Sequence, residues 1–127
     1  MIYDGINGYT KGSLNVPVNT ILAMTKGPIA GRNWHNSSFD PTYSITITSG
    51  ATGAVALEGT NDVVFASSDD SRIAYDFLPP EGASWTPLQA ATSTSASGTI
   101  STSYYFLRLR VTTQGSGTIL NAWVFWN

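Results

Sequence analysis

The chain has 127 residues, of which 42% are hydrophobic and 11% are charged, and its formal net charge is −2. This length is enough for one hydrophobic core, so a single folding unit is expected. Its six lysines and arginines leave no basic surface for nucleic acid or an anionic membrane, so neither is an expected partner, and the lack of cysteine excludes disulfides and thiolate metal sites.

Residues 1–40 give few signals of regular structure. Glycines and prolines such as Gly5, Gly8 and Pro17 recur there and interrupt any strand pattern. The segment VNTILAMTKG, residues 18–27, fits a short helical turn and an extended segment equally well. We therefore expect residues 1–40 to form an irregular N-terminal arm that lies across a partner, and residues 41–127 to form the folded domain.

From residue 41 onward, β-branched and aromatic residues recur in short runs separated by turn residues. These runs predict strands near residues 42–48, 54–58, 72–77, 85–89, 103–113 and 117–126. The segment AATSTSASGT, residues 90–99, is low in complexity and predicts a solvated loop. Because the spacing leaves no room for helical crossovers, the expected fold class is all-β, an antiparallel β-sandwich or jelly roll.

The last two predicted strands are unusually apolar. In the first, alternation places on the core face Tyr105, Leu107, Leu109 and Val111. In the second, one face carries Leu120, Ala122, Val124 and Trp126, and the other Ile119, Asn121, Trp123 and Phe125. We interpret the first of these faces as core and the second as a contact with another subunit. The reverse assignment also fits, as does cover by another sheet or by the N-terminal segment.

Six aromatic residues are the candidates for contacts with other subunits. They are Trp34, Tyr104, Phe106, Trp123, Phe125 and Trp126. Aromatic side chains dominate the energetics of protein interfaces, which is why these positions are preferred.

Three segments, YSITITSGATGAVALEGTND, WTPLQAATSTSASGTIS and YYFLRLRVTTQGSGTI, resemble small virion structural proteins of tailed bacteriophages. Those proteins share an acidic strand end, a Trp-containing strand, a Ser/Thr-rich loop, a strand alternating aliphatic residues with arginine, and a Gly-Ser-Gly-Thr hairpin. The resemblance covers about residues 43–120 and implies a capsid decoration or cement protein, a head fibre or a minor tail component. The chain departs from the pattern in an insertion over residues 63–84 and in its aromatic end, AWVFW.

A catalytic site is not expected. His35 is the only histidine, and a Ser/His/Asp set with Ser37 or Ser38 and Asp40 is formally available. No nucleophile elbow and no glycine pattern for an oxyanion hole accompany it. We therefore predict that the protein is not an enzyme.

Metal and cofactor sites are not expected either. Asp69 and Asp70, with Asp62 nearby, offer carboxylates to calcium but lack EF-hand spacing. A solvated acidic loop is the expected structure. No glycine-rich phosphate loop is present, so no nucleotide cofactor is expected.

A carbohydrate-binding module is the main alternative. Exposed tryptophans on a β-sandwich stack against sugar rings, and four are available: Trp34, Trp85, Trp123 and Trp126. Such modules are usually secreted, whereas this sequence shows no secretion leader. A phage receptor-binding protein would meet that objection.

The expected function follows from the surface and the location together. The sequence shows neither a leader nor the run of about 18 apolar residues that a membrane span needs. Its polar surface depends on hydroxyl groups rather than charges. A protein made in the cytosol that works outside the cell reconciles these features, and a virus particle is the simplest case. We expect a phage virion protein that contacts the major capsid protein or other virion proteins and forms an oligomer, with a trimer favoured.

Overall fold

The computed structural model describes residues 12–26, 42–62, 64–65, 77–100 and 104–125. These residues form strands joined by turns and loops, without a helix. The strands are β1 (Gly12–Ser13), β2 (Ile21–Lys26), β3 (Thr42–Ile47), β4 (Ala54–Thr60), β5 (Val64–Phe65), β6 (Phe77–Leu78), β7 (Thr86–Thr92), β8 (Ala96–Thr99), β9 (Phe106–Thr113) and β10 (Thr118–Phe125).

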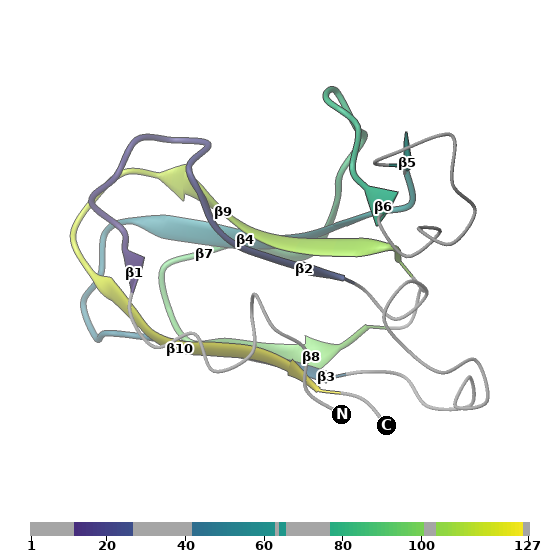
Figure 1. Ribbon diagram of the computed structural model, residues 1–127. Coiled ribbons are helices and arrows are strands. Elements are labelled where there is room, and N and C mark those ends of the chain that lie inside the picture. Colours follow the sequence, from purple (N-terminus) through teal and green to yellow (C-terminus); the bar gives the residue numbers. More distant parts are fainter. Residues whose placement is uncertain (1–11, 27–41, 63, 66–76, 101–103, 126–127) are drawn as a thin grey trace.

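Two four-stranded sheets lie face to face as two layers (Figure 1). Sheet A has the strand order β1-β10-β3-β8, and sheet B has the order β2-β9-β4-β7. All neighbouring strands run antiparallel. The predicted all-β antiparallel sandwich is confirmed. Strands β5 and β6 form a small antiparallel pair that projects from one end, within the predicted insertion.

The chain passes from one sheet to the other at nearly every connection. Strands β1, β3, β8 and β10 belong to sheet A, and each is followed or preceded by a strand of sheet B. Strands β9 and β10 therefore do not pair with each other, and the segment that joins them is an arch between the sheets. The predicted Gly-Ser-Gly-Thr hairpin is wrong in this respect, because the glycines serve an inter-sheet connection.

The core lies between the sheets. Sheet A contributes Tyr43, Ile45, Ile47, Ile119, Ala122 and Val124, and sheet B contributes Ala23, Val55, Leu57, Leu107, Leu109 and Val111. Of the predicted core positions, Leu107, Leu109 and Val111 are fully buried, which confirms the alternation within β9, whereas Tyr105, which precedes β9, is partly exposed and its prediction as core is wrong. Fully burying side chains of this size stabilises the fold by about 1.5–3 kcal/mol each.

Part of the predicted N-terminal arm belongs to the sandwich. Residues 12–26 contain β1, paired with β10, and β2, paired with β9, and Leu14 between them is fully buried. The boundary at residue 40 is therefore wrong for this stretch, while residues 1–11 and 27–41 lie outside the described part. Segment 18–27 is extended over Ile21–Lys26, where β2 binds the edge of β9.

The low-complexity segment 90–99 is also structured. It contains the end of β7 and the whole of β8, so the prediction of a solvated loop is wrong. Strand β8 pairs with β3, and the Ser95 hydroxyl extends the ladder by accepting from the Ile47 amide at 2.9 Å. Small hydroxyl residues can form an edge strand because backbone hydrogen bonds do not depend on apolar side chains.

A β-bulge changes the faces of β10. The register against β3 shifts between Ile119 and Asn121. As a result Ile119, Ala122 and Val124 all face the core, whereas Leu120 is 47% exposed. The prediction was correct for Ala122 and Val124 and wrong for Leu120 and Ile119, because strict alternation fails across an inserted residue.

The arches at one end of the sandwich are bonded to one another. The Ser116 carbonyl accepts hydrogen bonds from the amides of Thr52 and Gly53, both at 3.0 Å. On the other side, the Leu14 amide donates to the Gly117 carbonyl at 3.0 Å. A Cβ atom on Gly53 would lie 2.6 Å from the Leu14 Cβ, so only glycine permits this approach. Three connections distant in sequence are thereby fixed together.

One polar contact crosses the core. The Tyr43 hydroxyl of sheet A donates a hydrogen bond of 2.6 Å to Gln89 Oε1 of sheet B. Burial raises the pKa of Tyr43, so the hydroxyl stays protonated and remains a donor. This contact fixes how the two sheets lie relative to each other at the β7 edge.

Gly59 of β4 leaves room for an aromatic ring. A Cβ atom there would lie 2.7 Å from Cγ of Tyr104. We expect Gly59→Ala to lower the free energy of unfolding by about 1–3 kcal/mol, because the buried ring cannot move aside. Urea denaturation measures the change. In a Tyr104→Leu background, the penalty of Gly59→Ala should be smaller, and an equal penalty in both backgrounds would contradict the steric explanation.

Candidate functional site

The chemically distinctive surface is the outer face of sheet B. Along β4, Val55 and Leu57 point into the core, so the alternate positions Ala56, Glu58 and Thr60 point outward. Glu58 is only 4% exposed although it lies on this outer face. A buried carboxylate requires charged or hydrogen-bonding partners.

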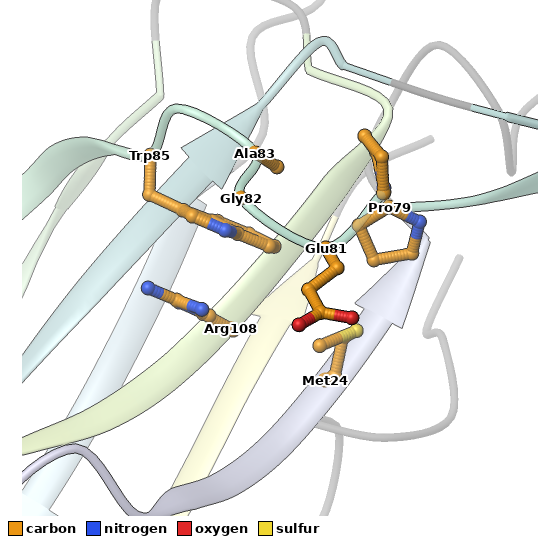
Figure 2. A pocket seen from close by; sticks show the side chains of 8 residues that line it. Met24, Pro79, Glu81, Gly82, Ala83, Trp85 and Arg108 are labelled. Atoms are coloured by element: carbon orange, nitrogen blue, oxygen red, sulfur yellow. The ribbon is translucent and has the colours of Figure 1, made fainter.

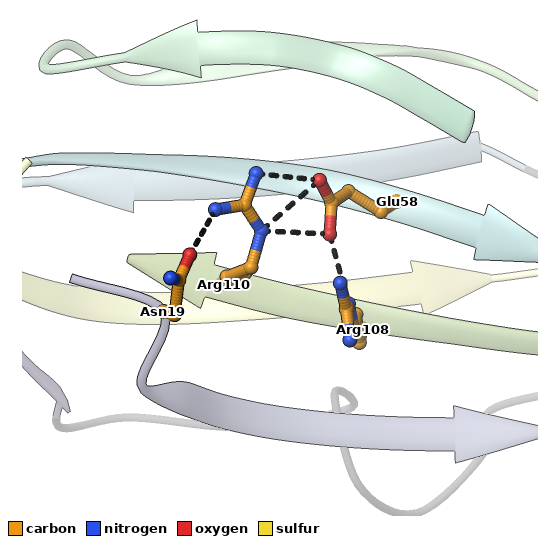
Figure 3. Close-up of polar contacts among 4 residues, drawn as sticks. All are labelled: Asn19, Glu58, Arg108 and Arg110. Atoms are coloured by element: carbon orange, nitrogen blue, oxygen red, sulfur yellow. Dashed lines mark hydrogen bonds and ion pairs between the residues drawn. The ribbon is translucent and has the colours of Figure 1, made fainter. Parts of the chain in front are cut away.

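Two arginines of β9 supply those partners (Figure 3). Arg108 Nε donates to Glu58 Oε1 at 2.8 Å. Arg110 donates from Nε to Oε1 at 3.0 Å and from Nη2 to Oε2 at 2.8 Å. The antiparallel register places Glu58 directly opposite Arg108, and the alternate position Arg110 lies on the same face. Both carboxylate oxygens are therefore bound by guanidinium groups.

The electrostatics favour the charged form of Glu58. Burial raises the pKa of its carboxyl group, but the hydrogen bonds and positive charges of Arg110 and Arg108 outweigh burial, so the pKa lies below its ordinary value. The hydrogen bonds donated to Glu58 raise the pKa of Arg110, against the effect of its own burial. The three side chains carry one negative and two positive charges, and a net charge of +1 remains.

Asn19 completes the cluster from the segment before β2. Its Oδ1 accepts a hydrogen bond from Arg110 Nη1 at 2.7 Å. Its backbone has a φ of 74°, in the left-handed region that asparagine tolerates better than most residues. The Asn19 amide also donates to the Val111 carbonyl at 2.8 Å. This turn is thus joined to β9 through both backbone and side chain.

Replacing Glu58 by glutamine tests the cluster. At neutral pH we expect Glu58→Gln to lower the free energy of unfolding by about 2–4 kcal/mol, because two partly buried guanidinium groups lose their counter-charge. A folded-state pKa below the ordinary value of 4.5 makes the contribution complete above that pH and lost as the pH falls through the folded-state pKa. The difference in unfolding free energy between the wild type and Glu58→Gln should therefore shrink below about pH 4.5.

Denaturant titrations between about pH 7 and pH 3 measure that difference. Glu81→Gln is the matched control, because it removes an exposed carboxylate that makes no ion pair with the described residues. Its effect should be small at every pH. A Glu58→Gln difference that stayed constant down to the lowest pH would show that the charge of Glu58 is not what stabilises the cluster.

Arg108 also contacts an aromatic ring. Its guanidinium carbon lies 4.0 Å from the centroid of the Trp85 ring, a cation–π contact (Figure 2). Trp85 immediately precedes β7 and directly follows the inserted segment 63–84. Because Arg108 is held by Glu58, the position of Trp85 depends on the same ion-pair cluster.

A groove lies beside this contact. It has a volume of about 520 Å³ and is lined by residues that include Met24, Pro79, Glu81, Gly82, Trp85 and Arg108. This is within the range of about 300–1,000 Å³ that is typical of small-ligand sites. Figure 2 shows Glu81 and Met24 on one side of the groove and the stacked Trp85 and Arg108 on the other.

The loop over the groove has a defined conformation. The Ala83 amide donates to the Pro80 carbonyl at 3.0 Å, and Gly82 has a φ of 81°, as in a type II turn. The Ser84 amide donates to Asp62 Oδ2 at 2.8 Å, which joins the end of the loop to the end of β4. Glu81 therefore projects from a turn that is bonded at both sides.

The predicted interface residues are not gathered on this face. Tyr104 is 9% exposed and belongs to the core, and Phe106 is 4% exposed, so both are covered by the chain itself and their prediction as free contact surfaces is wrong. Alternation misplaced Tyr104 because β9 begins only at Phe106. Trp123 is half-buried on the outer face of β10. The side chain of Phe125, and the residues Trp126 and Trp34, lie outside the described part.

The other predicted chemical candidates are also outside it. They are His35, Ser37, Ser38, Asp40, Asp69 and Asp70. Among the described residues, no three histidine, cysteine or acidic side chains converge as metal ligands would. The same residues contain no apolar helix long enough to cross a bilayer.

Sequence reasoning missed the Glu58 cluster and the groove. A signal was present: AVALEGT is an apolar strand with one acid, and LRLR places two arginines on one face of another strand. A carboxylate in a buried strand requires partners, and these arginines were the natural ones. The contact of Trp85 with Arg108 had no such signal, because it depends on the path of the loop.

Comparisons with protein-family models, curated proteins and solved structures found no match to this chain.

Proposed function

We propose that the chain is a structural protein of a virus particle, where it decorates or cements the shell through contacts with neighbouring subunits. The observation that carries this proposal is the apolar character of an unpaired sheet edge. Strand β2 is one of four edge strands of the two sheets, with β1, β7 and β8, and within the described residues it has a neighbour on one side only. The other side presents backbone groups that can pair with another chain.

The side chains along this edge are unusually exposed. Of the four large apolar side chains that are exposed in the described part, three are Val18, Ile21 and Met24, in β2 or just before it. The fourth, Leu120, stands alone on sheet A, and a single exposed leucine is common in monomeric proteins. Three such residues on an open edge are more typical of a contact site.

The strand order supports the same proposal. Without the β5–β6 pair, eight strands remain, and sheet A takes the first, eighth, third and sixth, while sheet B takes the second, seventh, fourth and fifth. We infer from this order a jelly-roll topology of two Greek keys, an arrangement found in viral capsid proteins and in lectins. Because a fold does not decide function by itself, the proposal rests on the exposed apolar residues at the β2 edge.

Such a role requires no catalysis. Each subunit that buries apolar edge surface against the shell stabilises the assembled form by mass action. The scarcity of charged residues fits this mechanism, because like charges on adjacent copies would oppose close packing. The resemblance to phage virion proteins points in the same direction.

The decisive experiment is to purify virus particles from cells that carry the gene. Mass spectrometry of density-banded particles should find the chain in a fixed ratio to the major shell protein. Separate analysis of heads and tails distinguishes decoration of the capsid from a tail or fibre component. Absence of the chain from all purified particles would refute the proposal.

The edge itself is tested with Val18→Ser combined with Ile21→Ser. The wild type should sediment as an oligomer, with a trimer expected, and the double variant should associate at least about tenfold more weakly, because each lost apolar contact costs about 1–2 kcal/mol. Leu120→Ser is the control, since it removes an exposed apolar side chain from the other sheet. Equal association of all three proteins would contradict a role for β2.

A further inference from the structure

The groove beside Trp85 has the properties of a preorganised binding site. Glu58 holds Arg108, Arg108 stacks on Trp85, and the loop that carries Glu81 is closed by the Pro80–Ala83 turn. Its walls therefore need little rearrangement to accept a ligand, which reduces the entropic cost of binding. The two proposed sites share Met24, which is exposed on β2 and lines the groove, whereas Val18 and Ile21 lie outside the lining.

The groove offers both hydrogen-bond donors, on Arg108, and hydrogen-bond acceptors, on Glu81. Arg108 uses Nε to bind Glu58, and its two Nη atoms make no hydrogen bond with the described residues. Glu81 is exposed and likewise has no hydrogen-bond partner among those residues. The guanidinium group supplies donors only and the carboxylate supplies acceptors only. A ligand with hydroxyl groups satisfies both, because each hydroxyl donates and accepts.

The lining of the groove has no net charge that would attract an ion of one sign. Among the residues that line the groove, Glu81 contributes one negative charge and Arg108 one positive charge, so the sum is zero. For a singly charged ligand, attraction to one of Arg108 and Glu81 is offset by repulsion from the other. An uncharged polyhydroxyl molecule meets no such repulsion.

The remaining walls are apolar. Trp85, Met24 and Pro79 present ring and thioether surface to the groove (Figure 2). Sugar rings combine hydroxyl groups at their edges with C–H groups on their faces, and such faces pack against aromatic and aliphatic side chains.

We propose that this groove binds a neutral saccharide beside the stacked Trp85 and Arg108, with a sugar face against Met24 and Pro79 and with hydroxyl groups hydrogen-bonded to Arg108 and Glu81. The proposal does not depend on the role in a virus particle. It gives the protein a recognition function in addition to an assembly function.

The test uses the full chain, isotopically labelled, and follows the indole N–H signals by NMR. The probes are uncharged hexasaccharides of glucose, mannose, galactose and N-acetylglucosamine. An acidic galacturonic acid hexasaccharide and an arginine-containing proline-rich peptide are the competing ligand classes. At least one neutral saccharide should shift the signal that disappears in Trp85→Phe.

Variants then locate the binding. Glu81→Gln and Trp85→Ala should each weaken affinity for that saccharide by at least about tenfold. Glu81 is exposed, so Glu81→Gln remains informative even if Trp85→Ala unfolds. Leu120→Ser, on the other sheet, should bind as the wild type does, and so should the Val18→Ser, Ile21→Ser variant, which separates saccharide binding from assembly.

Three outcomes overturn the proposal. The first is that no neutral saccharide shifts the Trp85 signal. The second is that the acidic saccharide or the peptide binds more tightly than every neutral one. The third is that Glu81→Gln leaves the affinity unchanged.

Discussion

The carboxylate of Glu58 is the constraint on which the outer face of sheet B depends. It is buried in the middle of β4 and opposite β9, where it binds both Arg108 and Arg110. Through Arg110 it reaches Asn19 and the turn before β2, and through Arg108 it reaches Trp85 and the loop before β7. One side chain thus joins four segments that are distant in the sequence. Such a cluster specifies geometry as well as contributing stability, because any one unpaired charge would be costly there.

The inner and outer faces of the two sheets are stabilised by different kinds of interaction. Between the sheets, closely packed aliphatic residues such as Leu107, Leu109 and Ile45 exclude water. Outside sheet B, ion pairs and a cation–π contact hold the covering segments. The outer side of sheet A carries hydroxyl residues, such as Ser44 and Ser97, which lie opposite each other in neighbouring strands. The outer faces of the two sheets therefore differ in chemistry, although the chain as a whole has few charged residues.

The fold class could be predicted from the sequence, and the positions of several strands with it. Strands β3, β4, β9 and β10 have strong β-branched patterns, and in β9 and β10 core residues were correctly placed where alternation is regular, as at Leu109 and Val124. Strand β8 could not be found, because its stability comes from backbone pairing with β3 and not from its own apolar residues. The faces of Leu120 and Ile119 could not be found either, because a β-bulge leaves no mark in the hydrophobic pattern. Of the site, the partners of Glu58 were predictable in principle, whereas the position of Trp85 depends on long-range folding of a loop.

The alternation of strands between the sheets has a consequence for how the protein is made. Gly12 of β1 pairs with Ile119 of β10, so the first described strand finds its place only against the last. Among the described strands, β2 likewise pairs only with β9, which is made much later. Because non-local pairings require long loops to close before any contact forms, this topology folds slowly compared with one built from hairpins. On the ribosome, most of both sheets must remain open until the final strand has emerged, and during that interval the unpaired sides of β3 and β4 are open to aggregation. Three of the edge strands have features that disfavour pairing with other chains: β1 is short, β8 is rich in hydroxyl residues, and β7 contains a proline.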